Sequence, residues 1–221
     1  MTLPRDEVSK GLVAELEAFE RLVRSLSPDE LQAPSRCEGW TAADVAAHVI
    51  GAMADITQGR FDGQGTPEVT ERQVIERRGR SADELAEELR AASEVAPTLL
   101  GAFDDDAWEA PAPGGFEFSL GEGVEALWYD AYLHADDIRA ATGRPSERGD
   151  GLRASIEHVA TILERQGWGP ATIALDGSGE RAVGGRGGRR VVADPLEFVL
   201  VATGRSDPSA LGLDPTVNIY R

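Results

Sequence analysis

Four segments in the first 143 residues repeat apolar side chains at the three- and four-residue spacing of an α-helix. This spacing gathers the apolar side chains on one face of each segment, and such a face must be buried against another element. Stretches rich in proline and glycine separate the segments, so the pattern predicts an up-and-down four-helix bundle. The segments cover residues 5–26, 41–55, 81–103 and 119–142.

Three of these segments begin with a helix-capping pattern. Thr41, Ser81 and Ser119 are each followed three residues later by Asp or Glu. The hydroxyl and the carboxylate can therefore satisfy free amide groups of the first turn. The last segment ends at Gly143 with Pro145 just beyond, which is a typical stop signal. The intervening stretches are predicted as breaks or loops, at residues 27–40, 59–67 and 104–118.

The last third of the chain follows a different pattern. Short β-type runs at residues 171–177 and 189–194 are separated by a glycine-rich turn at 181–188. An Asp-Pro pair then starts a helix that ends at Gly204. We predict a connecting helix followed by a small α+β region. The expected fold class is α+β, with a helical domain at residues 1–148 and a small C-terminal domain at 149–221.

Composition excludes several classes of function. The net charge of −17 argues against nucleic acid or an anionic membrane as a partner, because phosphate contacts need clustered Lys and Arg. Residues 151–221 hold eight arginines and eight acidic residues, so residues 1–150 carry the whole net charge. No apolar run approaches the ~18 residues of a membrane span. The N-terminus lacks a signal-peptide pattern, so we expect a cytoplasmic protein.

Two of the three histidines interrupt the apolar faces of their helices. His48 lies in the apolar stripe of the second segment, and His134 lies in that of the fourth. Asp130 comes one turn before His134, and Asp137 comes three residues after it. Two histidines and one carboxylate form a common ligand set for zinc, with a fourth position left for water or substrate. The alternative is a local helix pair beside a packed core histidine, and the spacing leaves both interpretations open.

Two stretches carry a family resemblance. CEGWTAADVAAHVIGA (residues 37–52) and DAYLHADD (residues 130–137) resemble the mycothiol-dependent maleylpyruvate isomerase family, which belongs to the DinB-like metal-binding helical bundles of actinobacteria. The end of the chain, VLVATGR followed by GLDPTVNIYR, is similar as well. The resemblance therefore spans nearly the whole chain.

The resemblance implies a divalent metal ion, usually zinc, held by His48, Asp130 and His134. Asp130 stands where the family has glutamate and is one methylene shorter, so the metal would lie closer to the helix backbone or be bound through water. Asp137 matches an aspartate of the family and is interpreted as orienting an imidazole or tying the bundle to the C-terminal domain. Arg205, in a family-like Gly-Arg pair, is a candidate for gripping a substrate carboxylate, although an ordinary helix-end arginine is the alternative.

The resemblance also implies that the metal binds the sulfur of mycothiol, a low-molecular-weight thiol. A metal-bound thiol is deprotonated near neutral pH and is a ready nucleophile. We therefore expect a thiol-dependent enzyme acting on a small electrophile such as maleylpyruvate, either as an S-transferase or as a cis-trans isomerase. The alternative is a non-catalytic small-molecule binding or interaction protein with a weakened metal site, which Asp130 favours. A monomer and a homodimer are both compatible with either function.

Three further residues are given structural roles. Trp40 is expected to pack as a hydrophobic staple before the Thr41 cap. Cys37, the single cysteine, excludes an internal disulfide and a multi-cysteine zinc site, and it has no histidine nearby in the sequence to activate it. His158 has no carboxylate one turn earlier. We expect none of the three to act in catalysis.

Overall fold

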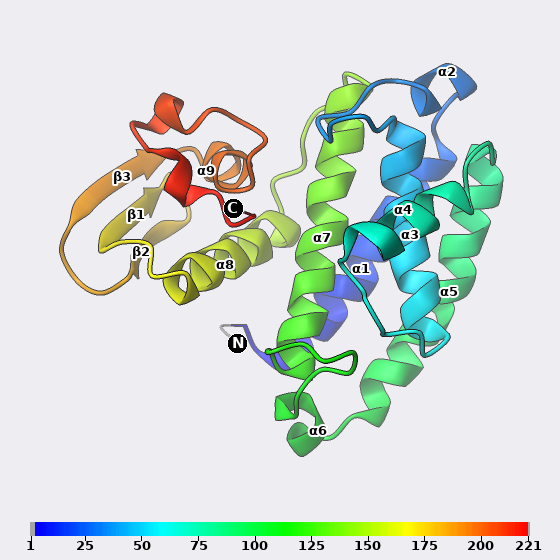
Figure 1. Cartoon of the computed structure of the whole chain (residues 1–221), viewed down its shortest axis with the longest axis horizontal. Helices are drawn as coiled ribbons and strands as arrows, with labels where there is room; N and C mark the ends of the chain where they lie inside the picture. Colours follow the sequence, from blue (N-terminus) through cyan, green and yellow to red (C-terminus); the bar gives the residue numbers. More distant parts are fainter. Residues whose placement is uncertain (1–2, 221) are drawn as a thin grey trace. The chain divides into compact units, whose positions relative to one another are not determined.

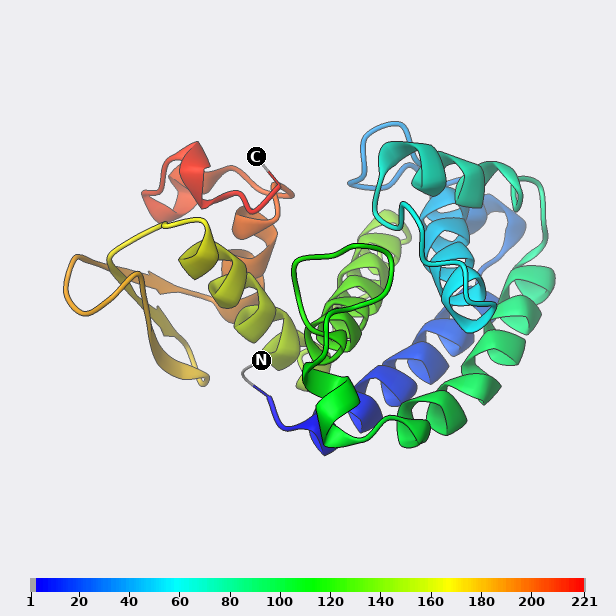
Figure 2. The same cartoon turned by 60° about the horizontal axis from the view of Figure 1, so that its bottom comes forward.

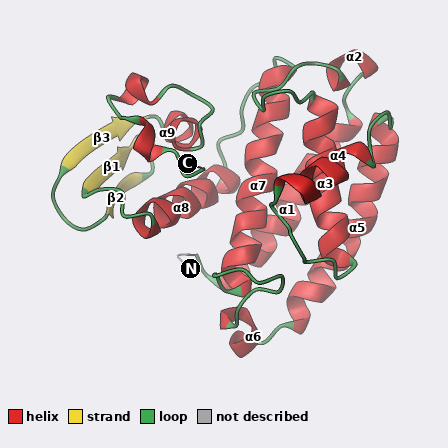
Figure 3. Ribbon diagram, in the orientation of Figure 1, coloured by secondary structure: helices red, strands yellow, loops and turns green. Residues whose placement is uncertain are grey.

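The computed structural model describes residues 3–220 and divides into two compact units (Figures 1 and 3). The first unit comprises Leu3–Glu147 and is helical, whereas the second begins at Arg148 and contains the strands. No helix in the described part of the chain is both long enough and apolar enough to cross a bilayer.

The first unit is built on a four-helix bundle of α1 (Arg5–Arg24), α3 (Ala42–Thr57), α5 (Ala82–Ala102) and α7 (Leu120–Ala141). Both α1 and α3 pack against α5 and α7, as Figures 1 and 2 show. The predicted helical bundle and the α+β class are confirmed. Large apolar side chains at helical spacing fill the core, including Leu12, Leu16, Phe19, Ile50, Leu85, Leu89, Trp128 and Leu133.

The predicted capping boxes are present at the starts of three bundle helices. The hydroxyls of Thr41, Ser81 and Ser119 each accept a hydrogen bond from the backbone N–H three residues later. The carboxylate at that later position accepts the backbone N–H of the cap residue in return. These starts agree with the sequence because capping is a contact among four consecutive residues.

Successive helices of the bundle do not simply alternate in direction, which corrects the predicted up-and-down order within the confirmed helical bundle. At the end of α1, Arg24 Nη1 lies 3.5 Å from Oδ1 of Asp83, which is at the start of α5. These two helices are therefore antiparallel. Arg78, just before α5, lies 3.4 Å from Asp44 at the start of α3, so α3 and α5 begin at the same end of the bundle. Residues 58–81 carry the chain back between them (Figure 1).

Three short helices lie outside the predicted set. The helices α2 (Pro28–Leu31) and α6 (Asp105–Glu109) occupy stretches that we predicted as loops, and there the prediction is wrong. The helix α4 (Pro67–Ile75) lies in a stretch for which no element was predicted. Helices of four to nine residues are too short to show a repeated apolar face, so periodicity does not reveal them.

Changing Gly11→Ala is expected to destabilise the first unit by about 1–3 kcal/mol. A β-carbon at this position in α1 would lie 2.2 Å from the ring of Trp128, which is fully buried in α7, so the ring or the helix must move. The matched control is Gly101→Ala in α5, where nothing lies within 4 Å of the added carbon. Denaturant unfolding followed by circular dichroism measures both variants, and equal stabilities would contradict the close approach of α1 and α7.

The second unit joins α8 (Asp150–Arg165) and α9 (Pro195–Ala202) to a small sheet. In its described part the sheet has the order β2-β1-β3, with β1 (Ala171–Leu175) antiparallel to β2 (Gly179–Val183) and parallel to β3 (Arg189–Ala193). Part of the predicted glycine-rich turn is thus strand β2, which corrects the prediction. Buried side chains line one face in register, with Ala171 opposite Val183 and Ile173 opposite Val191. Two short 3₁₀ helices follow, at Pro208–Leu211 and Pro215–Val217.

Candidate functional site

His48 and His134 face each other from two neighbouring helices, α3 and α7. Their ring centroids are 5.2 Å apart, with an interplanar angle of 87°. Asp130 Oδ2 is 3.8 Å from His48 Nε2, and Asp130 Oδ1 is 3.4 Å from His134 Nε2. Because residues four apart on a helix lie on one face, Asp130 and His134 reach the same point from α7. The structure thus brings together the three side chains predicted as metal ligands, with their ligand atoms within 4.8 Å of one another.

The far side of the His134 ring is held by a carboxylate. His134 Nδ1 lies 3.0 Å from Oδ2 of Asp137, which is fully buried. A carboxylate can only accept, so Nδ1 carries a proton toward Asp137, and Nε2 is the nitrogen that faces Asp130. Asp137 thus lies where it can orient an imidazole, which is one of the two roles predicted for it.

His48 is held in a matching way by a residue of α4. Its Nδ1 lies 3.1 Å from Oε1 of Gln73, which leaves Nε2 facing Asp130. The side chains of His48 and His134 are 14% and 11% exposed, whereas that of Asp130 is 30% exposed. The two histidines are therefore largely shielded from solvent, whereas the Asp130 carboxylate is partly exposed.

The two histidines differ in their affinity for a proton. Burial lowers the pKa of His48, and the nearby Asp130 carboxylate does not compensate for it. Burial also opposes protonation of His134, but Asp130, Asp137 and Cys37 outweigh it and raise the pKa of His134 well above its usual range. His48 is thus neutral near pH 7, whereas a cation bound at this site must compete with a proton on His134.

The loop before α3 packs against the polar end of α7. Arg36 Nη2 donates to the side chain of Asp136 at 2.5 Å and to its backbone carbonyl at 2.7 Å, and Arg36 Nε lies 3.5 Å from Asp137 Oδ1. Cys37 Sγ donates to Asp137 Oδ2 at 3.4 Å and lies 4.0 Å from His134 Nδ1. The sequence placed no histidine near Cys37, but folding brings one beside it from 97 residues away.

Cys37, His134 and Asp137 form a second group of side chains that could hold a metal ion. Within this group, Cys37 and His134 already form hydrogen bonds to the Asp137 carboxylate. By contrast, in the group of His48, Asp130 and His134 the Nε2 atoms of two imidazoles face one carboxylate. The donor chemistry therefore favours the group of His48, Asp130 and His134, which we call the His–Asp–His site.

Trp40 lies at the edge of the His–Asp–His site. We predicted only that it packs before the helix cap, but its ring centroid is 5.5 Å from that of His48, at an interplanar angle of 52°. The indole therefore forms one wall beside a predicted ligand. This contact was missed because Trp40 comes just before α3, where the helical period does not fix the direction of a side chain.

Two residues considered from the sequence lie in the second unit. Arg205 follows α9, and its Nη1 donates to the backbone carbonyl of Thr203 at 3.4 Å. Its role in gripping a substrate carboxylate stays a prediction. His158 lies on α8 and is no member of the two groups described above.

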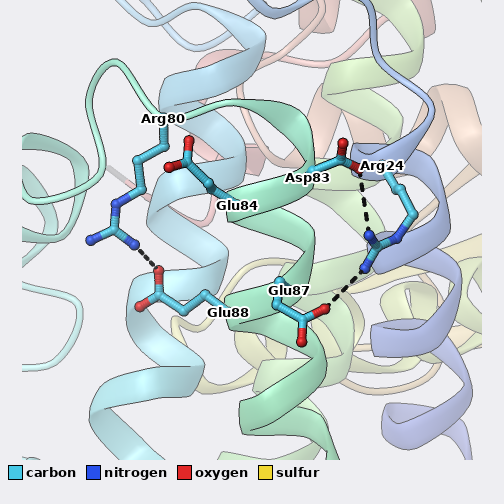
Figure 4. A pocket seen from close by; sticks show the side chains of 6 residues that line it. All are labelled: Arg24, Arg80, Asp83, Glu84, Glu87 and Glu88. Atoms are coloured by element: carbon cyan, nitrogen blue, oxygen red, sulfur yellow. Dashed lines mark hydrogen bonds and ion pairs between the residues drawn. The ribbon is translucent and has the colours of Figure 1, made fainter.

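A charged surface pocket in the first unit offers a contrasting arrangement (Figure 4). Its arginines form ion pairs with its acidic side chains. Arg80 Nη1 lies 2.5 Å from Glu88 Oε2, and Arg24 Nη1 lies 3.5 Å from Asp83 Oδ1. Exposed pairs of this kind satisfy one another and contribute little to stability. We therefore interpret this pocket as a surface ion-pair cluster. It is lined by Arg24, Arg80, Asp83, Glu84, Glu87 and Glu88.

The site residue that the sequence least revealed is Gln73. It lies on α4, a helix absent from the predicted set, and its side chain reaches His48 across 25 residues of sequence. A local signal for this helix does exist, because Thr66 caps it and Pro67 occupies its first turn. That signal marks the helix but does not indicate which of its residues faces α3.

The chain is similar to a known protein family and to solved structures. The sequence model of the family described as "Mycothiol maleylpyruvate isomerase N-terminal domain" matches residues 12–139, more than half of the chain. A crystal structure of mycothiol-dependent maleylpyruvate isomerase is similar with a TM-score of 0.69, and that of a histidine-to-alanine mutant with 0.66. Both are 19% identical to this chain, and each match covers 96% of both chains. No curated protein matches the chain.

At this level of identity the solved structures establish a shared fold. The family match covers α3 and most of α7, and with them the three residues of the His–Asp–His site. The chain belongs to the mycothiol maleylpyruvate isomerase N-terminal domain family.

Proposed function

We propose that the protein is a divalent-metal-dependent enzyme that uses a mycothiol-type thiol to transform a small electrophile. The substrate class is an unsaturated acid such as maleylpyruvate, and the reaction is a cis-trans isomerisation or an S-transfer. The observation that carries the proposal is the His–Asp–His site, where the Nε2 atoms of two imidazoles and one carboxylate converge.

The donor set fits a zinc ion. Zinc sites in enzymes commonly use two histidines and one carboxylate and leave a fourth position open. Bound there, the metal would supply a lowered pKa for a coordinated thiol. His48, Asp130 and His134 would hold it, and Asp137 keeps the proton of His134 on Nδ1.

Other residues of the chain would shape the site around the reacting groups. Trp40 shields one side of His48 from water. Arg205 is our candidate for the substrate carboxylate, because a guanidinium grips a carboxylate with two parallel hydrogen bonds. These assignments rest on donor chemistry and on the family of the chain.

The proposal is tested by combining metal analysis with a thiol-dependent assay. Protein purified without a metal-binding tag is analysed by elemental mass spectrometry, stripped with a chelator and reloaded with zinc. Each form is then incubated with maleylpyruvate in the presence and absence of mycothiol. We expect turnover only when both metal and thiol are present.

Mass spectrometry of the products separates the two reactions. An isomerase returns a product of unchanged mass, whereas an S-transferase returns a product heavier by the thiol. Glutathione replaces mycothiol as the control for thiol selectivity. Metal-independent turnover, or no bound metal even after incubation with zinc, would refute the proposal as stated.

A second candidate function is a non-catalytic binding or interaction protein with a weakened metal site. The observation that favours it is Asp130, which is shorter than the family's glutamate. The geometry speaks for a competent site, however. Ligand atoms around a tetrahedral zinc with bonds near 2.0–2.2 Å are spaced by roughly 3.3–3.6 Å. Asp130 Oδ1 lies 3.4 Å from His134 Nε2 and Asp130 Oδ2 lies 3.8 Å from His48 Nε2, close to this spacing, which supports an aspartate as a ligand.

Changing Asp130→Glu is therefore expected to leave zinc affinity unchanged or to lower it up to about tenfold, because the extra methylene has to be accommodated in a site already closed by aspartate. Competition with a chromophoric chelator measures the affinity. The exposed Asp83→Glu on α5 serves as the control for the same chemical change. A gain of tenfold or more in Asp130→Glu would instead indicate that the natural site is weakened.

A further inference from the structure

We infer that Gln73, oriented by the buried carboxylate of Asp55, is a positioning residue that fixes the proton of His48 on Nδ1 and so aims Nε2 at the metal position. This inference rests on the proposed metal site. It concerns a residue of α4, a helix that contributes no residue to the predicted set of metal ligands.

One face of α3 is shaped to receive the Gln73 side chain. His48, Gly51 and Asp55 are spaced by three and four residues, so they follow one another along a single helical stripe. A β-carbon on Gly51 would lie 2.6 Å from Cβ of Gln73, so only glycine lets α4 approach this closely. The side chain of Gln73 thus packs against α3 at Gly51 and lies between His48 and Asp55.

The orientation of the Gln73 amide is determined by the groups at its nitrogen end. Gln73 Nε2 donates to Asp55 Oδ2 at 2.9 Å and to Gln64 Oε1 at 3.1 Å. Gln64 is itself fixed, because its Nε2 donates to Asp55 Oδ2 and to the backbone carbonyl of Arg60. A reversed amide at Gln73 would place its oxygen against a carboxylate and another carbonyl, which electrostatic repulsion excludes.

The remaining atom, Gln73 Oε1, lies 3.1 Å from His48 Nδ1. A carbonyl oxygen only accepts, so the neutral imidazole must carry its proton on Nδ1. The electron pair then lies on Nε2, the atom 3.8 Å from Asp130. The carboxylate of Asp55 therefore acts on His48 through one amide, as Asp137 acts on His134 directly.

Asp55 is strongly anchored in this role. Its carboxylate is fully buried and accepts hydrogen bonds from the guanidinium groups of Arg60 and Arg72, each at 2.6 Å. It also accepts hydrogen bonds from the side-chain amides of Gln73 and Gln64. These contacts join α3, the loop after it and α4. The proton position on His48 is consequently tied to how α4 packs on α3.

The test uses nitrogen NMR of metal-free protein together with zinc affinity. At mildly alkaline pH, where the imidazole of His48 is neutral, the nitrogen shifts of wild-type His48 are expected to show the Nδ1–H form. In Gln73→Met, which keeps the length of the side chain but accepts no hydrogen bond, the Nε2–H form should appear and zinc affinity should fall about 10–100-fold. The matched control Gln32→Met makes the same change at an exposed glutamine and should stay within about threefold of wild type.

An Nε2–H form in wild type would overturn the inference without any variant. An unchanged tautomer and zinc affinity in folded Gln73→Met would overturn it as well, because Gln73 would then only pack against α3.

The result of this test can be told apart from the result of the test of the proposed function. The tautomer is read in metal-free protein, so it decides the role of Gln73 even if wild type binds no zinc. Conversely, bound zinc together with an Nε2–H His48 in the metal-free form would support the metal site and refute the inference.

Discussion

The double variant His48→Ala/His134→Ala is expected to bind zinc at least about ten-thousandfold more weakly than wild type. Structural zinc in peptides binds with about 10–16 kcal/mol shared among four ligands, which is about 3 kcal/mol for each ligand. Two lost ligands therefore remove about 6 kcal/mol, and each 1.4 kcal/mol is tenfold. Asp130 alone would remain, and a single carboxylate does not hold zinc against water. Turnover should be lost with the metal.

The measurement is metal content by elemental mass spectrometry, followed by competition with a chelator of known affinity. The chain supplies a matched control in its third histidine, because His158→Ala makes the same change in the second unit. Circular dichroism shows whether the double variant keeps its helices. About one ion per chain retained by the folded double variant would mean that the metal is held elsewhere, and Cys37 and Asp137 would be the next residues to test.

Changing Asp55→Ala is expected to lower the free energy of unfolding by about 3–5 kcal/mol, the usual effect of removing one partner from a buried charge network. Asp55 is fully buried and accepts hydrogen bonds from the side chains of Gln73, Arg72, Gln64 and Arg60. The variant leaves the buried amide of Gln73 and two guanidinium groups without their shared acceptor. Metal affinity should fall as well, because Gln73 is no longer oriented toward His48.

The pH dependence of stability gives an independent reading of the same residue. Burial alone would raise the pKa of Asp55, but hydrogen bonds from Gln73, Arg72, Gln64 and Arg60 outweigh it and lower the pKa from 3.8 to about 2. A lowered pKa means that the carboxylate adds stability above the unfolded value of 3.8 and that this stability is lost as pH falls toward 2. The contribution is on the order of 2 kcal/mol.

Urea unfolding of metal-free protein at several pH values between neutral and pH 2 measures both effects. Wild type should lose this contribution on acidification, whereas Asp55→Ala should lack that part of the pH dependence. Asp62→Ala, an exposed residue of the neighbouring loop, is the control and should change stability by less than about 0.5 kcal/mol. Equal stability of wild type and Asp55→Ala at neutral pH would refute the role of Asp55 as the anchor of α4.

The features that the sequence predicted well are contacts between residues that lie close together in the chain. The capping boxes at Thr41, Ser81 and Ser119 are contacts within one turn, so the starts of three bundle helices follow from four-residue patterns. The short helices were missed for the complementary reason, because an element of one or two turns has no apolar period. The strand β2 was missed because its glycine-rich surroundings resemble a turn.

The same division applies to the His–Asp–His site. The sequence by itself determined that His48 and His134 break the apolar faces of their helices and that Asp130 lies one turn from His134, because helical periodicity fixes the direction of each side chain. Only the tertiary structure decided that these groups converge and that Gln73, Trp40 and Cys37 surround them. Those contacts join residues far apart in the chain, and their geometry depends on the packing of α4 and of the loop before α3, which no local pattern specifies.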